Sequence, residues 1–167
     1  MTQLLEAEPI VASSPHDAAV GERFLVCQVG TRRCALPIDH VTETMRALPC
    51  EPLAGAPAFV RGVAVVRGAA VPVVDSGLLL GATPAAGGRF VSLAVEGRTV
   101  ALAVDAVLGV TPMAGDAVHQ LPPLLEVATG AVIEALGVLD SELLIVLRES
   151  RLVPESVWSL IAARETV

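Results

Sequence analysis

Hydrophobic residues in this chain occur in short runs that end at a glycine, a proline or a charged residue. In the clearest case, apolar runs over Val63–Val66 and Ala69–Val74 flank the charged corner Arg67-Gly68. β-Branched runs of this length around a glycine-containing corner predict two strands and a tight turn. Pro72 interrupts the second run, and because proline cannot donate to a β-ladder, we expect it at an edge or a bulge.

The same pattern predicts a first hairpin near the N-terminus. Strands are expected over Arg23–Val29 and Arg33–Ile38, separated by a short polar turn. Asp39 then has the character of a helix N-cap. Val41 and Met45 follow at a spacing that places both on one helical face. We therefore expect a short helix or irregular turn after the first hairpin.

Loops and a terminal helix complete the predicted elements. Prolines and glycines make Leu48–Phe59 an ordered loop and Gly81–Gly88 a linker, and Met113–Glu126 is expected to be a second loop. Pro154–Arg164 is expected to be a helix, because proline suits the first helical turn. The apolar stripe of this helix comprises Val157, Trp158, Leu160 and Ile161.

Two stretches of the chain repeat each other. Arg89–Val110 aligns with Arg23–Thr44 without a gap, 66 positions apart. The coincident residues include Arg23 with Arg89, Phe24 with Phe90, Arg32 with Arg98 and Asp39 with Asp105. Val71–Asp75 resembles Leu144–Arg148 more faintly, 73 positions apart. Since small curved sheets close into barrels to remove exposed edges, the duplication predicts two small β-barrels about a pseudo-twofold axis.

Composition and charge argue against several classes of protein. Hydrophobic residues make up 53% of the 167 residues, yet the most apolar region, Gly62–Gly81, is interrupted by Arg67, Pro72 and Asp75. It therefore lacks the run of about 20 apolar residues that a transmembrane helix requires. The first residues do not resemble a secretory signal, so we expect a cytoplasmic protein. A net charge of −7 and few aromatic residues argue against nucleic-acid binding.

No catalytic or metal site emerges from the motifs. Cys27, Cys34 and Cys50 form no CxxC pair, and we expect them to be small buried hydrophobes. No constellation supplies a nucleophile, a base and an oxyanion donor together. We expect no enzymatic activity, no metal and no cofactor. A β-barrel hydrolase that uses His40 or His119 is the alternative, and a turnover that is abolished by His40→Ala or His119→Ala would reveal it.

The charged corner at Arg67 has two interpretations. It is either a solvated turn residue or a contact residue presented to a partner, because loop tips on rigid scaffolds often carry function.

The run FVRGVAVVRGAAVPVVD, Phe59–Asp75, resembles the signature of the CheW-like domain, a family of chemotaxis coupling proteins. The matching positions are Gly62, Val63, Arg67, Gly68, Val71, Pro72 and Asp75. Residues 24–44 and 103–110 resemble two further motifs of the family, the first through Val41 and Glu43.

This resemblance implies a mainly β fold of two five-stranded SH3-like barrels about a pseudo-twofold axis, with short helices and a C-terminal helix. We expect a flexible tail over 1–21, a CheW-like domain over 22–153 and the helix within 154–167. The duplicated halves are expected at about 22–81 and 89–153.

The resemblance also implies a non-enzymatic adaptor. It would couple the cytoplasmic tips of methyl-accepting chemoreceptors to the regulatory domain of a CheA-type histidine kinase, with other CheW-like domains as further partners. The partner-binding residues that it implies are Val41, Glu43 and Thr44 at the receptor groove, and Gly62, Arg67 and Gly68 by the central hairpin. Asp75 would be structural.

Three departures from the family pattern leave alternatives open. Val65 replaces a usual asparagine, Cys34 a usual aromatic residue, and Arg148 a usual aspartate or asparagine. One alternative is a divergent scaffold of an auxiliary chemosensory pathway. Another is a regulator with a phosphorylatable domain, which the lack of a receiver-like acidic cluster argues against.

Overall fold

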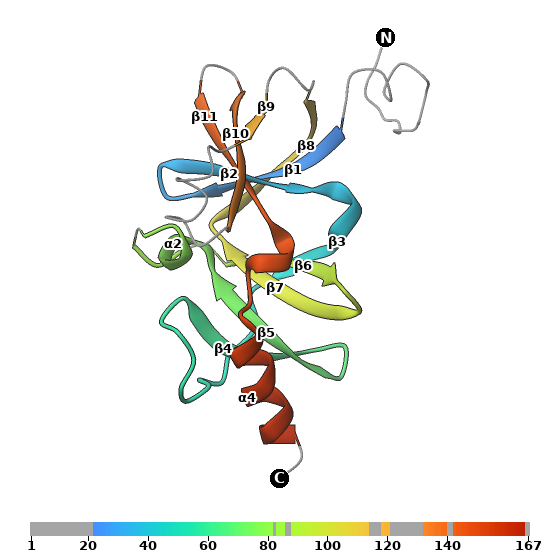
Figure 1. Cartoon of the computed structure of the whole chain (residues 1–167), viewed down its shortest axis with the longest axis vertical. Helices are drawn as coiled ribbons and strands as arrows, with labels where there is room; N and C mark the ends of the chain where they lie inside the picture. The colour runs from blue at the N-terminus through green and yellow to red at the C-terminus, as the bar shows by residue number, and fades with distance from the viewer. Residues whose placement is uncertain are drawn as a thin grey trace.

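The computed structural model describes residues 22–81, 83–85, 88–113, 118–120, 132–139 and 142–165, and its strands form two sheets (Figure 1). The first sheet consists of β1 (Glu22–Val29), β2 (Arg32–Pro37), β8 (Ala106–Met113), β9 (Val118–Gln120), β10 (Ile133–Leu139) and β11 (Glu142–Leu147), in the order β8-β1-β2-β11-β10-β9. The second consists of β3 (Val41–Arg46), β4 (Val60–Val66), β5 (Ala69–Asp75), β6 (Arg89–Val95) and β7 (Arg98–Val104), in the order β3-β6-β7-β5-β4. The mainly β class is confirmed.

Each sheet combines strands from both sequence repeats. The β1–β2 hairpin of the first repeat lies among β8 to β11, and the β6–β7 hairpin of the second repeat lies among β3 to β5. The two repeats have therefore exchanged their first hairpins. The boundary between the sheets consequently does not follow the boundary between the repeats.

The strand registers repeat at the offsets that the sequence alignment predicts. Val146 stands opposite Ala35 in the first sheet, and Val73 stands opposite Ala101 in the second. The edge pairings repeat in the same way, including a bulge on β8 and on β3 at equivalent positions. This correspondence confirms the alignment of the repeats and the pseudo-twofold relation of the two sheets.

Three hydrophobic clusters follow from this arrangement. A central core unites residues of both sheets, among them Leu25, Leu93 and Leu102. A first inner cluster belongs to the first sheet and comprises Phe24, Val26, Ala35, Met113, Ala135, Leu144 and Val146. A second inner cluster belongs to the second sheet and comprises Ala64, Val66, Val71, Val73, Phe90, Ala101 and Ala103. The inner strands of the second sheet, such as β5 and β7, bury residues on both faces and are therefore nearly continuous hydrophobic runs.

The sheets are less closed than predicted. The outermost strands of each sheet, β8 and β9 in the first and β3 and β4 in the second, do not pair with each other among the described residues. The first sheet also has a sixth strand, β9, within the segment predicted as the loop Met113–Glu126; most of that segment lies outside the described residues. The predicted tail over 1–21 lies outside them as well.

Of the short helix or irregular turn expected after the first hairpin, the structure contains only a turn. Only Ile38–His40 forms a 3₁₀ turn, and its N-cap is Pro37 rather than Asp39. Val41–Arg46 is strand β3, in which half-buried and exposed residues alternate. The bulge at Thr42 separates the two apolar residues that suggested a helical face, so that Val41 packs against the central core and Met45 against the second inner cluster.

The expected edge position of Pro72 is also wrong, because β5 lies between β7 and β4. Pro72 is tolerated there since the parallel pairing of β5 with β7 begins only at Val73. The missing N–H therefore falls at the end of that ladder.

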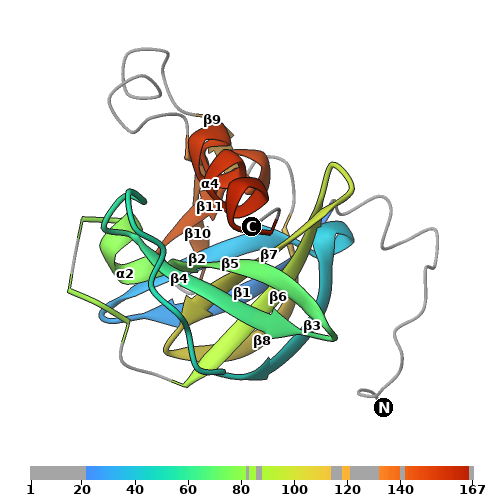
Figure 2. The ribbon, with the colours of Figure 1, turned by 90° about the horizontal axis from the view of Figure 1, so that it is seen from below.

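Helix α4 (Glu155–Glu165) follows Pro154 and closes one end of the central core. It buries Val157 and Ile161, two residues of the predicted stripe. Arg98 stacks 4.7 Å from the ring centroid of Trp158 and forms a bidentate pair with Glu155. The helix therefore packs against β7, and it lies at the end of the molecule where Figure 1 shows the C-terminus. Figure 2 shows the same helix seen from below. No helix among the described residues is long and apolar enough to cross a membrane.

Candidate functional site

The turn between β4 and β5 has a backbone that few residues adopt. Arg67 has φ 51° and Gly68 has φ 81°, so both lie in the left-handed region that a tight hairpin turn of this type requires. Glycine adopts this conformation readily, whereas arginine does so uncommonly. The equivalent turn between β6 and β7 has the same conformation, with φ 51° at Glu96 and φ 79° at Gly97.

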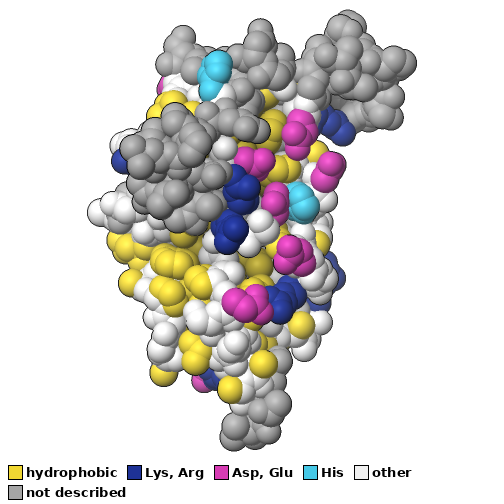
Figure 3. Space-filling model, viewed as in Figure 1, with side chains coloured by type: hydrophobic (Ala, Val, Ile, Leu, Met, Phe, Trp, Pro, Cys, Tyr) yellow, Lys and Arg dark blue, Asp and Glu magenta, His cyan; other side chains and the backbone are white. Residues whose placement is uncertain are grey.

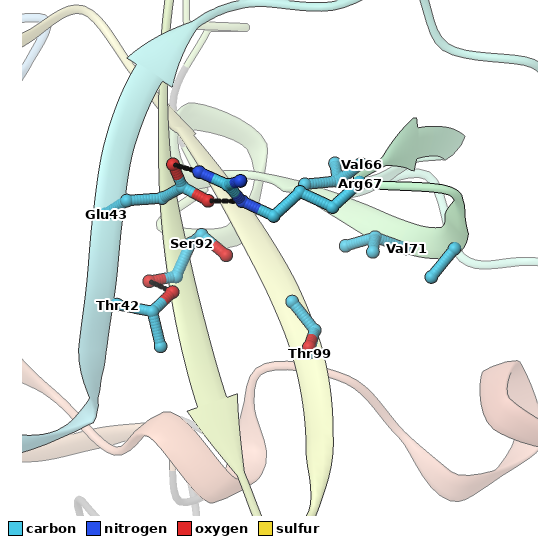
Figure 4. A pocket seen from close by; sticks show the side chains of 8 residues that line it. Thr42, Glu43, Val66, Arg67, Val71, Ser92 and Thr99 are labelled. Atoms are coloured by element: carbon cyan, nitrogen blue, oxygen red, sulfur yellow. Dashed lines mark hydrogen bonds and ion pairs between the residues drawn. The ribbon is translucent and has the colours of Figure 1, made fainter.

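Arg67 makes a two-pronged ion pair with Glu43 of β3. Its Nε lies 2.7 Å from Oε2 and its Nη2 lies 2.8 Å from Oε1 (Figure 4). The arginine side chain is 78% exposed and that of Glu43 is 29% exposed. The hydrogen bonds from Arg67 lower the pKa of Glu43, and those to Glu43 raise the pKa of Arg67, so both groups are held charged.

This ion pair links the two ends of the second sheet. Strand β3 lies at one edge and β4 at the other, and the tip of the β4–β5 hairpin reaches β3 (Figure 2). The curl of the sheet brings these edges together, and the side chains rather than the backbone join them. Arginine suits this position because its planar fork matches a carboxylate.

A hollow of about 400 Å³ opens beside the ion pair. Figure 4 shows side chains from β3, β6, β7 and the β4–β5 hairpin around it. Its lining comprises Thr42, Glu43, Val66, Arg67, Ala69, Val71, Ser92 and Thr99. Valine and alanine provide apolar walls, while hydroxyl and charged groups are arranged around them. Such a mixture suits one small apolar group of a partner together with polar contacts at the rim.

The structure brings together only some of the predicted partner-binding residues. Glu43, Arg67 and Gly68 lie at the turn and its ion pair, and Thr44 is exposed one residue further along β3. Val41 is half-buried against the central core. Their assignment to a partner remains a prediction.

Gly62, for which a partner contact is also predicted, is buried on β4. A Cβ there would lie 2.1 Å from the carbonyl oxygen of Glu51, which pairs with Val63 in an isolated β-bridge. Its φ of 142° is also one that side chains rarely adopt. Glycine is needed so that the loop preceding β4 can lie on that strand.

Asp75 has the structural role that was expected. Its carboxylate is 1% exposed, accepts from Arg61 Nε at 2.9 Å, and caps the short helix α2 (Ser76–Leu79) through the N–H of Leu78 at 3.0 Å. The N–H of Ala85 donates to the same carboxylate at 3.0 Å. Asp75 therefore ties the linker between the repeats to the second sheet.

Among the polar residues that line the hollow, the sequence does not identify Thr42, Ser92 and Thr99. Each comes from a different strand, so only the strand order brings them together. The bulge on β3 at Thr42 could be located only once the register was known.

Nothing in the described part of the chain resembles a metal centre, since no three His, Cys, Asp or Glu side chains gather there. Cys27 and Cys34 are opposed on β1 and β2 and are fully buried. A hydrogen bond with Cys27, reinforced by burial, raises the pKa of Cys34, so its thiol stays protonated. On the face in Figure 3, acidic and basic side chains intermingle without a basic patch.

Comparison with known proteins identifies the family. The model of the CheW-like domain matches residues 23–157. The chain belongs to the CheW-like domain family. Within this family, it is 31% identical over 115 residues to the chemotaxis protein CheW of Rhizobium meliloti (strain 1021), covering 67% of this chain and 74% of that protein.

A solved structure has the same CheW-like fold. It is the scaffolding protein TtCheW from Thermoanaerobacter tengcongensis, with a TM-score of 0.67 and 23% identity, covering 77% of this chain and 89% of that one. The resemblance drawn from the sequence motifs is thereby confirmed. The CheW-like family consists of non-catalytic adaptors, and this chain is a CheW-like scaffold of chemotaxis signalling.

Proposed function

We propose that this CheW-like domain couples the cytoplasmic tip of a methyl-accepting chemoreceptor to the regulatory domain of a CheA-type histidine kinase. It does so in the cytoplasm and without chemistry of its own. Family membership supports this proposal, because the family consists of non-catalytic adaptors. Two pseudo-symmetric sheets also provide the separate faces that a bridging protein needs.

The Arg67–Glu43 ion pair is the observation from which we assign part of the binding surface to particular residues. Arginine is enriched among the residues that dominate binding energy at protein interfaces. The carboxylate fixes the guanidinium in place while leaving the side chain 78% exposed. A side chain ordered before binding loses less conformational entropy when a partner arrives. Arg67 is therefore prepared for recognition and is also part of the second sheet's closure.

Calorimetric titration tests the proposal. The chain is titrated with the regulatory domain of a co-encoded CheA-type kinase and, separately, with a receptor tip fragment. Arg67→Glu should weaken at least one of these interactions by about tenfold or more, the effect expected at an interface hot spot. Binding by a kinase of an auxiliary pathway instead would favour the alternative of a divergent scaffold.

A matched control is available on the same sheet. Arg98 also forms an exposed bidentate pair, with Glu155 of α4, so Arg98→Glu makes an equivalent charge change elsewhere. Circular dichroism should show that both variants fold. Unchanged binding by a folded Arg67→Glu variant would remove Arg67 from the interface. Failure of the wild-type chain to bind either partner would contradict the adaptor function itself.

A further inference from the structure

Two hairpin turns are equivalent under the internal repeat, and each lies beside the segment that follows the last strand of its own half. The turn between β1 and β2 lies beside α2 and the linker after it (Figures 1 and 2). The turn between β6 and β7 lies beside α4. Val29 pairs with Arg32 across the first turn, and Val95 pairs with Arg98 across the second, 66 positions later. The chain therefore contains two versions of one site.

At the second turn, α4 covers the site. Arg98 forms a bidentate pair with Glu155 and stacks on the ring of Trp158, three positions further along the helix. Leu152 and Val153, which lead into the helix, are 0% and 8% exposed. The space that is left between the turn and the helix is only about 30 Å³. One helix therefore provides the partners of the arginine and covers the apolar residues beside it.

At the first turn, the chain does not continue into such a helix. Helix α2 has four residues, and Gly81 follows it with φ 76°. Leu79 and Leu80 are equivalent to Leu152 and Val153 at the offset of 73 positions, yet they are only half-buried. A groove of about 280 Å³ lies here, which we call the Arg32 groove. Its described lining comprises Val29, Gly30, Thr31, Arg32, Leu80, Thr83, Pro84 and Asp105.

The Arg32 groove combines an apolar wall with an exposed cation. Arg32 is exposed, and its Nη1 lies 3.5 Å from the carbonyl oxygen of Leu80, a long contact that leaves further N–H donors of the guanidinium for a carboxylate. Leu80 and Pro84 contribute apolar surface. The carboxylate of Asp105 accepts from the N–H of Gly30 at 2.6 Å, so it is held at the turn. The groove therefore has the same chemical character as the site that α4 covers.

We propose that the Arg32 groove is a docking site for an amphipathic helix of a partner protein. This helix carries a glutamate that pairs with Arg32 and, three positions later, an aromatic residue that covers the guanidinium. The chemistry of the occupant follows from α4, which meets the equivalent Arg98 with the same two groups. Helices commonly bind in apolar grooves, and an arginine over an aromatic ring adds a favourable cation–π contact. The residues of the Arg67–Glu43 pair do not line this groove, and the inference does not rest on the proposed adaptor function.

A helical peptide with the sequence of α4 tests the site. The peptide spans residues 154–165 and carries a hydrocarbon link between the positions of Ser159 and Ala163, which are exposed on the native helix. The link keeps the peptide helical, so that little conformational entropy is lost on binding. When the unlabelled peptide is titrated into the isotope-labelled full chain, the methyl NMR signals of Leu79 and Leu80 should shift and saturate.

Charge substitutions on both sides test the predicted ion pair. Arg32→Glu should weaken binding of the peptide by about tenfold or more, because a repulsion replaces an attraction. Arg46→Glu is the matched control, since Arg46 is exposed on β3 outside the groove and its variant should bind as the wild-type chain does. A peptide with Glu155→Gln should also bind the wild-type chain more weakly. This peptide variant keeps the test independent of whether Arg32→Glu folds.

Three outcomes would overturn the proposal. The first is the absence of saturable binding up to about millimolar peptide, the weak end of specific affinities. The second is binding that is equally strong with and without the charges of Arg32 and of the peptide's glutamate. The third is a set of shifts confined to Leu152 and Val153, because the peptide would then be replacing the chain's own α4. None of these outcomes bears on binding of the receptor or the kinase.

Discussion

Arg67 reaches Glu43 across the gap between the first and last strands of the second sheet. In the described backbone, the edge strands β3 and β4 do not pair with each other. The ion pair connects these two edges of the sheet through side chains instead. Because Arg67 combines this contact with a left-handed backbone, the two contributions can be separated by substitution.

Replacing Arg67 by asparagine should release Glu43 while preserving the turn. Asparagine tolerates positive φ better than most residues, so the hairpin should remain. The pKa of Glu43, lowered by its hydrogen bonds from Arg67 in the wild-type chain, should rise towards the ordinary value of a glutamate side chain. NMR titration of the Glu43 carboxyl group measures this directly. An identical Glu43 pKa in both proteins would contradict the ion pair.

The same pair predicts the sign of a pH effect on stability. A carboxyl group whose pKa is lower in the folded state stabilises the fold above its unfolded pKa, and this stabilisation is lost as the pH falls through the folded pKa. The difference in unfolding free energy between wild type and Arg67→Asn should therefore be present near neutral pH and shrink below about pH 4. Urea denaturation at several pH values tests this, and a difference that grows on acidification would contradict it.

Asp75 should be far more important for stability than an exposed acidic residue. Asp75→Ala leaves Arg61 without its carboxylate partner and removes acceptors from the N–H groups of Leu78 and Ala85. Breaking a buried pair of this kind costs about 3–5 kcal/mol. Glu142→Gln, which removes the exposed partner of Arg33, should cost less than about 1 kcal/mol. Equal losses in chemical denaturation would contradict the assigned role.

Gly62 and Gly109 have nearly the same backbone conformation, so alanine substitutions at the two positions distinguish the cost of backbone strain from the cost of a steric clash. Gly62 has φ 142° and Gly109 has φ 143°, but only at Gly62 would a Cβ meet another atom within 4 Å. Gly109→Ala should therefore show the backbone strain alone, about 1–3 kcal/mol. Gly62→Ala should lose clearly more, because the added carbon would displace the chain at Glu51. Similar unfolding free energies for the two variants would contradict this prediction, because the loop at Glu51 would then move away from the added carbon without a loss of stability.

The docking of α4 should depend on its buried residues. Ile161→Ala removes a side chain that is 5% exposed and should cost about 2–5 kcal/mol. Leu160→Ala, at a half-buried position on the same helix, should cost less. Trp158 fluorescence can follow unfolding, since its ring packs against Arg98. A smaller loss at Ile161 than at Leu160 would contradict the observed packing.

The sequence predicts the strands and the repeat well because both depend on local patterns. Coincident residues such as Phe24 and Phe90 identify equivalent positions, and the strand registers follow them. The exchange of hairpins is not predictable in this way, because two repeats align equally well whether or not they exchange strands. Thr42 and Ser92 are missed for the same reason: their proximity depends on which strands are neighbours.

The error over Val41–Arg46 has a different physical cause. Residues four apart share a face in a helix, but they also share a face in a strand. Six residues are too few to distinguish the two periods. The partner contacts proposed for Glu43 and Arg67 involve the surface of a second protein, so a binding measurement is what tests them.

The exchanged hairpins have a consequence for the origin of the molecule. A polypeptide with only one of the repeats would leave its first hairpin without the strands that flank it here, and a twin polypeptide could supply them. The chain is thus arranged like a homodimer whose two subunits have been joined in one polypeptide. Because one polypeptide carries both repeats, equivalent positions in the two halves need not hold the same residue. Ser92 in the second sheet, for example, occupies the position equivalent to Val26 in the first. The two halves of the molecule therefore differ from each other, as two identical subunits could not.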